Sequence, residues 1–237
     1  GQPRPVGQAI VNNLFAAGES GRVPLVGVTG TYGRNTVAKL VARLLYLSAQ
    51  YVGLACSDGI FLGRRQVQKS DAANWEGGRR LLLNRAVEAA VIENGAEVIL
   101  GQGLPYDRCA VGIVTNIVPG DEHLERWDVQ PTGSEYYTTP RSIYRSQVDV
   151  VLPSGHAVLN AEDDLVASFA ELCDGEVIFF ACDAANPVLA AHLAAGKRGV
   201  TVVDNRIVLR TGSDETRLCR LVNAPYVGKT RSPKKIA

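Results

Sequence analysis

The fold is decided by residues 23–36, which read VPLVGVTGTYGRNT. Residues 23–28 form an apolar run typical of a buried strand in a parallel sheet. Residues 29–33 supply a glycine-rich turn. The next segment then carries apolar residues at helical spacing on one face, at Val37, Leu40, Val41, Leu44 and Leu45. A strand, a glycine turn and a helix that ends near residue 50 open a βαβ unit.

Short apolar segments continue this alternation along the chain. We expect strands at residues 89–92, 111–114, 148–152, 157–159, 177–180 and 200–203, and a hairpin at 60–67 around Gly63 and Arg64. Helical patterns occupy residues 75–84, 164–172 and 187–194, with one short helix in residues 9–17. The pattern predicts an α/β fold, a mainly parallel sheet flanked by helices. We divide it into a lead-in (1–22), an α/β core (23–223) and a basic C-terminal tail (224–237).

Composition excludes several classes of protein. The 237 residues are 46% hydrophobic and 21% charged, and 25 Lys and Arg against 24 Asp and Glu give a net charge of +1. This balance favours neither nucleic acid nor a membrane surface as a partner, and no apolar run approaches the roughly 20 residues that span a bilayer. The five cysteines show no CxxC spacing, which predicts no disulfide framework or zinc site and indicates a reducing cytoplasm. The chain starts at Gly1 and lacks methionine, so we expect a piece of a longer polypeptide.

The glycine turn lies where phosphate-binding loops lie, between a buried strand and the N-terminus of a helix. Backbone N–H groups and the helix dipole favour an anion there. A working loop ends in G-K-[ST], in which the lysine contacts the terminal phosphates and the hydroxyl contacts Mg²⁺. Here the corresponding pair is Arg34-Asn35. The local pattern therefore leaves two interpretations open, a phosphate site or a turn that merely joins strand to helix.

A nicotinamide-dependent dehydrogenase is a weaker interpretation. Glycines 27, 30 and 33 do not make G-x-G-x-x-G, and none of the eight tyrosines is followed by a lysine four residues later.

Ordered blocks of sequence point to a known family. They are residues 4–7 (RPVG), 9–10 (AI), 28–33 (VTGTYG), 57–60 (SDGI), 87–93 (VEAAVIE), 107–109 (DRC), 114–117 (VTNI) and 157–161 (AVLNA). Their order and spacing over residues 4 to 210 resemble the Mur-ligase-like module at the C-terminal end of cyanophycin synthetases. The resemblance implies a fold like the Mur ligase central domain. It also implies a parent enzyme with an N-terminal module and an ATP-grasp module, which makes a polyaspartate backbone decorated with arginine.

In that family a working Mur-like module uses ATP and Mg²⁺ to phosphorylate the aspartate side chain and joins arginine to it. The resemblance implies that the phosphate loop contains Gly30, Thr31, Gly33 and Thr36. Arg34 then stands at the lysine position and Asn35 at the hydroxyl position.

Further site residues follow from the same resemblance. Glu93 falls at the position of the Mg²⁺-binding carboxylate, and His123 approximates a histidine that helps to hold metal. Asn160 and Asp163 match a stretch near the nucleotide's base and ribose. Without nucleotide, that stretch is an ordinary helix start in which Asn160 is the cap. The family's arginine and two glycines after the Glu93 segment are replaced by Ala96, Glu97 and Val98.

The loss of the loop lysine, the loop hydroxyl and the arginine-glycine-glycine segment favours a degenerate ATP site. The leading hypothesis is a structural module of the second type of cyanophycin synthetase, in which a separate ATP-grasp module polymerises β-aspartyl-arginine dipeptides. This module then binds neither ATP nor Mg²⁺, and its partners are the other modules and further copies in a homo-oligomer. One alternative is an active ATP- and Mg²⁺-dependent ligase module that joins arginine to the aspartate side chain. The other is a free-standing regulator that senses nucleotide or anion.

Overall fold

The computed structural model describes residues 21–118 and 140–224, together with Gly7, Ile10 and Asn13, which are helical. The strands in these ranges form one sheet in the order β11-β10-β9-β8-β7-β6-β1-β5-β2-β3-β4. Their bounds are β1 Leu25–Thr29, β2 Val52–Cys56, β3 Gly59–Leu62, β4 Arg65–Gln68, β5 Ala89–Glu93, β6 Cys109–Val114, β7 Val151–Asn160, β8 Glu176–Phe180, β9 Arg198–Val203, β10 Arg206–Thr211 and β11 Asp214–Arg220.

The sheet is parallel from β2 through β5, β1, β6, β7 and β8 to β9, and antiparallel hairpins close its two edges. Its helices are α2 Arg34–Leu47, α3 Trp75–Leu82, α4 Ala96–Gln102, α6 Ser146–Asp149, α7 Asp164–Ser168 and α8 Pro187–Ala194, with the 3-10 turns η1 Pro140–Arg145, η2 Phe169–Leu172 and η3 Leu221–Asn223. The predicted α/β fold with a mainly parallel sheet is confirmed.

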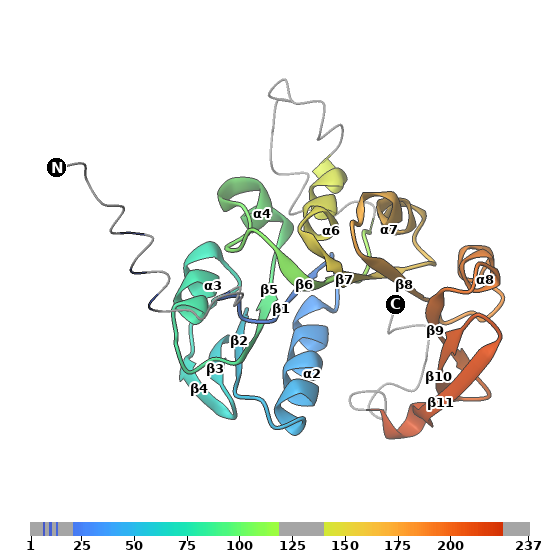
Figure 1. Cartoon of the computed structure of the whole chain (residues 1–237), viewed down its shortest axis with the longest axis horizontal. Helices are drawn as coiled ribbons and strands as arrows, with labels where there is room; N and C mark the ends of the chain where they lie inside the picture. The colour runs from blue at the N-terminus through green and yellow to red at the C-terminus, as the bar shows by residue number, and fades with distance from the viewer. Residues whose placement is uncertain (1–6, 8–9, 11–12, 14–20, 119–139, 225–237) are drawn as a thin grey trace.

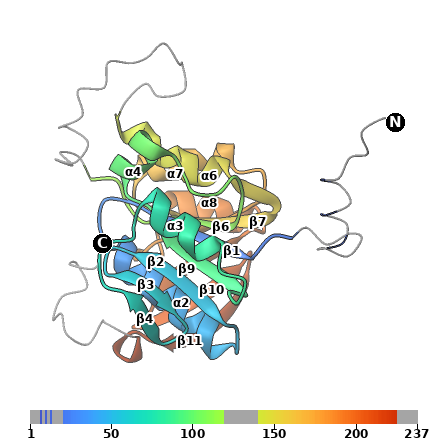
Figure 2. The same ribbon diagram turned by 90° about the vertical axis from the view of Figure 1, so that its left-hand side faces the viewer.

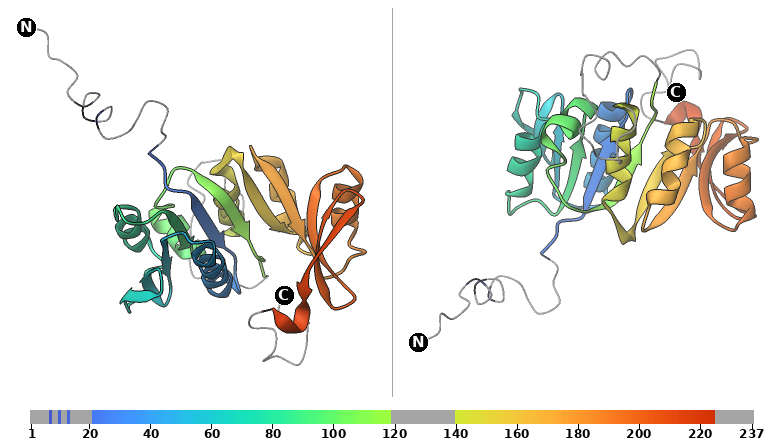
Figure 3. Two further views of the ribbon diagram at one scale, coloured as in Figure 1. Left: turned by 60° about the horizontal axis from the view of Figure 1, so that its bottom comes forward. Right: turned by 90° about the horizontal axis from the view of Figure 1, so that it is seen from above.

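The helices divide between the two faces of the sheet. Helices α3, α4, α6, α7 and α8 lie on one face and α2 on the other (Figures 1 and 2). The first face buries a large core that includes Leu81 of α3, Ile99 of α4 and Leu189 of α8. On the opposite face a smaller core forms where Ala38 of α2 packs against β1, β2, β5 and β6. Figure 3 shows the sheet between these layers, twisting towards the β10–β11 hairpin. None of the helices in the described ranges has the length and the apolar run that a bilayer crossing requires.

Most predicted elements are present. The helix predicted at 164–172 divides into α7 and the 3-10 turn η2, and two further details of the prediction are wrong. Residues 148–152 are not one strand, because Val148 ends up in α6 and β7 begins only at Val151. From there β7 continues as one strand through Pro153, Ser154 and Gly155 to Asn160, so the strand predicted at 157–159 is part of it. A shift in its register against β6 accommodates the extra residues. The second error concerns the apolar stripe of α2, because the side chain of Leu44 is 65% exposed. The side of α2 that packs on the sheet contains the small residues Ala38 and Ala42, and Leu44 lies outside it.

Strand β1 lies inside the parallel sheet, between β5 and β6, and Gly27 is closely packed within it. A Cβ at Gly27 would collide with the Tyr106 hydroxyl and the Gln147 amide. Gln147 is buried and Tyr106 half-buried, and the two groups are hydrogen-bonded to each other at 2.8 Å, so neither can move aside without losing a partner.

We therefore expect Gly27→Ala to lower the free energy of unfolding by about 1–3 kcal/mol through overpacking. Urea unfolding measures the change. The control is Ala49→Gly, an exposed position with φ 66 where glycine relieves backbone strain and stability should not fall. Equal stability of Gly27→Ala and the parent chain would contradict the close packing at β1.

Candidate phosphate-loop site

The loop between β1 and α2 is tied down by the chain that follows β6. Thr31 N donates to Asn116 O at 2.9 Å, and Tyr32 N donates to Asn116 Oδ1 at 3.0 Å. The Thr115 hydroxyl and the Asn116 amide both donate to Tyr32 O, at 2.8 and 3.0 Å. Gly30, with φ 136, is packed against the Thr115 side chain. These contacts commit the first N–H groups of the loop to the protein itself.

Arg34, the residue at the predicted lysine position, turns back into the loop. Its Nη1 donates to Gly30 O at 3.1 Å and Thr31 O at 3.2 Å, and its Nε donates to Glu93 Oε1 at 3.1 Å. The Arg34 side chain is 23% exposed and the Glu93 side chain 1%. The positive charge is therefore neutralised inside the protein rather than presented to a ligand.

Glu93, at the C-terminal end of β5, has both carboxylate oxygens engaged. Oε2 accepts from Asn35 Nδ2 at 3.0 Å, Ser57 N at 2.9 Å and the Ser57 hydroxyl at 3.2 Å. Asn35 Nδ2 also donates to Ser57 Oγ at 2.7 Å. A buried carboxylate is tolerated because it has this set of donors. The same donors occupy the oxygens that a metal ion would need.

The start of α2 keeps one feature of an anion site. Gly33, with φ 80, is the N-cap, and no side chain caps the helix. The first hydrogen bond of the helix runs from Val37 N to Gly33 O at 2.9 Å, so the N–H groups of residues 34–36 have no partner within the helix. Thr36 is exposed beside them. The helix dipole and these three donors favour a negative charge.

The two residues predicted near the nucleotide's base and ribose support the local structure. Asn160 Nδ2 donates to Thr115 O at 3.0 Å. Asp163 is the N-cap of α7, where it accepts from the backbone of Leu165 and Val166, and its other oxygen accepts from Ile117 N at 2.7 Å. The sequence alone suggested Asn160 as the cap of this helix, and this was wrong, because the cap is Asp163. Both residues connect to the phosphate loop through residues 115–117.

Other side chains beneath the loop were not predicted. Asn94 Nδ2 donates to the Tyr106 hydroxyl at 2.7 Å and to Gln147 Oε1 at 3.0 Å. Burial raises the pKa of Tyr106, so its hydroxyl stays protonated and donates to Gln147. The sequence showed Ser57, Thr115 and Asn116 only as members of the blocks that carry the family resemblance, because nothing local in the sequence indicates which side chains hold a loop in place.

Among the described residues, the site offers no further candidate for metal or thiolate chemistry. Within residues 21–118 and 140–224, no group of three His, Cys, Asp or Glu side chains is arranged to hold a metal. His123 lies outside the described residues. Burial and the neighbouring Glu93 charge raise the pKa of Cys56 to about 11, which keeps that thiol neutral.

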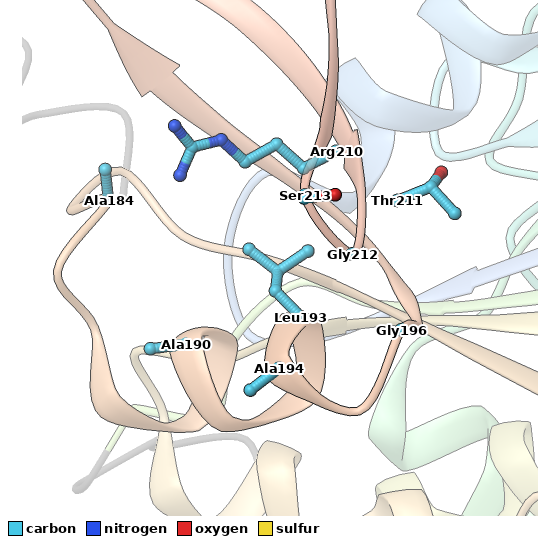
Figure 4. A pocket seen from close by; sticks show the side chains of 9 residues that line it. All are labelled: Ala184, Ala190, Leu193, Ala194, Gly196, Arg210, Thr211, Gly212 and Ser213. Atoms are coloured by element: carbon cyan, nitrogen blue, oxygen red, sulfur yellow. The ribbon is translucent and has the colours of Figure 1, made fainter.

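A cavity of about 670 Å³ lies elsewhere, between α8 and the β10–β11 turn. Figure 4 shows the Arg210 guanidinium extending across it, above Leu193 and the small residues of α8. Arg210 is paired with Glu215 at 2.9 Å, so its charge is already neutralised. The cavity contains none of the predicted site residues.

Residues 28–217 match the Mur ligase middle domain, and the chain belongs to this family. It is homologous over its whole length to cyanophycin synthetases, with 31% identity over 237 residues to the protein from Crocosphaera subtropica and 30% over 237 residues to that from Geminocystis herdmanii. The protein from a Synechocystis species is 34% identical over 203 residues, which are 86% of this chain. The matched region is 22–26% of the length of these relatives.

Solved structures agree on the fold. The chain is similar to a UDP-N-acetylmuramoyl-L-alanyl-D-glutamate–2,6-diaminopimelate ligase, with a TM-score of 0.56, 13% identity and coverage of 83% of this chain and 39% of that one. It is also similar to a bifunctional folylpolyglutamate synthase/dihydrofolate synthase with Mn, AMPPNP and L-glutamate bound, with a TM-score of 0.52, 15% identity and coverage of 88% and 52%. At these identities the likeness establishes the Mur ligase central-domain fold.

The ion pair between Arg34 and Glu93 should contribute measurably to stability. Arg34→Met leaves the buried carboxylate without its cation, and we expect the free energy of unfolding to fall by about 2 kcal/mol. This is less than the roughly 3–5 kcal/mol typical of a broken buried ion pair, because Asn35 and Ser57 still donate to the carboxylate. Adding Glu93→Gln should recover part of the loss, as urea unfolding of the double-mutant cycle will measure. The matched control is Arg79→Met, whose exposed pair with Glu76 at 3.5 Å should contribute below about 0.5 kcal/mol. Strict additivity at 34 and 93 would show that the two side chains do not interact.

Asp163 should matter to folding even without a ligand. Asp163→Ala removes the cap of α7 and the acceptor of Ile117 N, so we expect a loss of about 1–2 kcal/mol in the free energy of unfolding. Asp163→Asn keeps a capping oxygen and should lose less. Asp174→Ala, which removes an exposed partner of Arg108, serves as the control. A stability of Asp163→Ala within error of this control would refute the capping role.

Proposed function

We propose that this chain is a Mur-ligase-like module of a cyanophycin-synthetase-type ligase and that its phosphate loop does not bind Mg-ATP. The observation that carries the proposal is the position of Arg34, whose guanidinium is bound to two loop carbonyls and to Glu93. The module then serves as a structural part of the parent enzyme.

The loop lacks the free cation and the free oxygen ligand that the formation of an acyl phosphate requires. Activation of a carboxylate by ATP requires a cation on the transferring phosphoryl group and an oxygen ligand available to Mg²⁺. Here the cation is paired internally, the Glu93 oxygens accept four hydrogen bonds, and Asn35 turns its Nδ2 donor towards them. The residues as arranged do not suit Mg-ATP, and no catalytic step through it follows from them.

The remaining functions of the parent follow from the family. We assign ATP- and Mg²⁺-dependent ligation to a separate ATP-grasp module that polymerises β-aspartyl-arginine dipeptides in the cytoplasm. The N-terminal and ATP-grasp modules of the same polypeptide, and further copies in a homo-oligomer, are then the partners of this module. The 22–26% share of the relatives' length that it matches leaves room for such modules.

A working ligase module is the second candidate, and the start of α2 favours it. Three backbone N–H groups there remain without a partner in the helix, and Arg34 is partly exposed. On this alternative the module would use ATP and Mg²⁺ to join arginine to an aspartate side chain. Both nucleotide binding and this reaction would require Arg34 to leave Glu93.

Calorimetric titration with Mg-ATP separates the two candidates. We expect no binding by the parent chain, because Arg34 and Glu93 neutralise each other. The Arg34→Lys, Asn35→Thr double variant restores a compact cation and a hydroxyl, and we expect it to gain binding. Matching circular dichroism and melting curves establish that both proteins are folded. Micromolar binding by the parent would overturn the proposal and make ATP hydrolysis with acyl acceptors the next assay.

A further inference from the structure

A groove of about 290 Å³ lies between α2 and the β2–β3 hairpin, away from the phosphate loop. Figure 2 shows α2 beside β2 and β3 on this face of the sheet. Its floor is apolar and is formed by Val52, Leu54 and Phe61. The rim residues Lys39 and Arg43 come from α2, and Arg64 comes from the β3–β4 turn. Arg43 is nine residues from Arg34, about 14 Å along the helix axis. The groove is therefore separate from the site discussed above.

The three cations on the rim differ in their partners. Lys39 forms an ion pair with Asp58. In the part of the chain that the structure describes, neither Arg43 nor Arg64 has a hydrogen-bond or ion-pair partner, and the Arg43 guanidinium lies 5.7 Å from the centre of the Tyr46 ring. Two exposed guanidinium groups on opposite walls thus border one concavity without a counter-charge. Such a concavity attracts anions.

The position of Arg64 is set by its turn. Gly63, with φ 57, donates its N–H to Val52 O at 2.7 Å, and the position of its missing Cβ is 3.6 Å from the rings of Tyr46 and Tyr51. This packing holds the backbone of the turn against α2, so the Cα of Arg64 has a fixed place beside the groove.

The shape and the charge of the groove together restrict the chemical class of its ligand. Guanidinium groups pair with carboxylates through two parallel hydrogen bonds, and two such groups on facing walls suit a ligand with more than one carboxylate. The apolar floor suits the methylene groups of side chains, which an inorganic anion lacks. Nucleic acid is disfavoured, because two unpaired cations and a net charge of +1 do not make the basic stripe that a phosphate backbone needs.

We propose that this groove binds a short carboxylate-rich peptide, with Arg43 and Arg64 each pairing with one carboxylate and the floor covered by the side-chain methylenes. The groove contains no residue of the phosphate loop, and peptide binding to it is measured without nucleotide. Success or failure here is therefore distinguishable from success or failure of the proposed function.

The test is calorimetric titration of the full 237-residue chain with acetylated triaspartate amide. We expect saturable binding that weakens at high salt and falls about tenfold or more in Arg43→Gln and in Arg64→Gln, since each variant removes one charged hydrogen-bonded pair. The matched control is Arg85→Gln, which removes an exposed guanidinium outside the groove and should leave the affinity unchanged. Thermal unfolding of each variant verifies that it is folded.

Three outcomes would overturn the proposal. The first is an absence of saturable binding to the parent chain. The second is an equal loss in Arg85→Gln, which would indicate attraction to the general surface charge. The third is binding of inorganic phosphate, with the same dependence on Arg43 and Arg64, while triaspartate does not bind.

Discussion

One buried carboxylate organises the candidate site. Glu93 stands at the end of a central parallel strand, is 1% exposed, and must be neutralised or hydrogen-bonded wherever it is ionised. The chain satisfies it from three directions, with a guanidinium from the start of α2, an amide from the next residue of α2, and a serine from the end of β2. The phosphate loop, β2 and β5 are thereby joined at one point.

The hydrogen-bond donors of Arg34 explain why this side chain points into the loop. A lysine would offer a compact charge at the end of a flexible chain, which could face either Glu93 or an anion outside. Arginine carries donors along a planar fork, so one side chain reaches Glu93 and two loop carbonyls at once. The contacts from Thr115 and Asn116 then hold the other side of the loop. The strand, glycine turn and helix of the loop are therefore joined by internal hydrogen bonds, and the charge of Arg34 is paired within the protein.

The sequence predicted the fold better than the site. Strand β1, the glycine turn and helix α2 follow from local patterns, because apolar runs and helical spacing report burial directly. Two details were wrong, because tertiary contacts decide them: Val148 is buried as part of α6 rather than of a strand, and Leu44 lies on the exposed side of α2. The structure brings the predicted residues Arg34, Asn35 and Glu93 together. The direction of the Arg34 side chain could not be predicted, because it depends on a contact between residues 59 positions apart. The roles of Asn94, Thr115 and Asp163 likewise arise from contacts that no local pattern encodes.

A crystal structure of the chain grown with Mg²⁺ and a saturating non-hydrolysable ATP analogue tests the central claim most directly. The account predicts an empty loop in which Arg34 remains within hydrogen-bond distance of Glu93, Gly30 and Thr31. Density for a triphosphate over residues 30–36, with Arg34 turned outward and a metal ion beside Glu93, would contradict it.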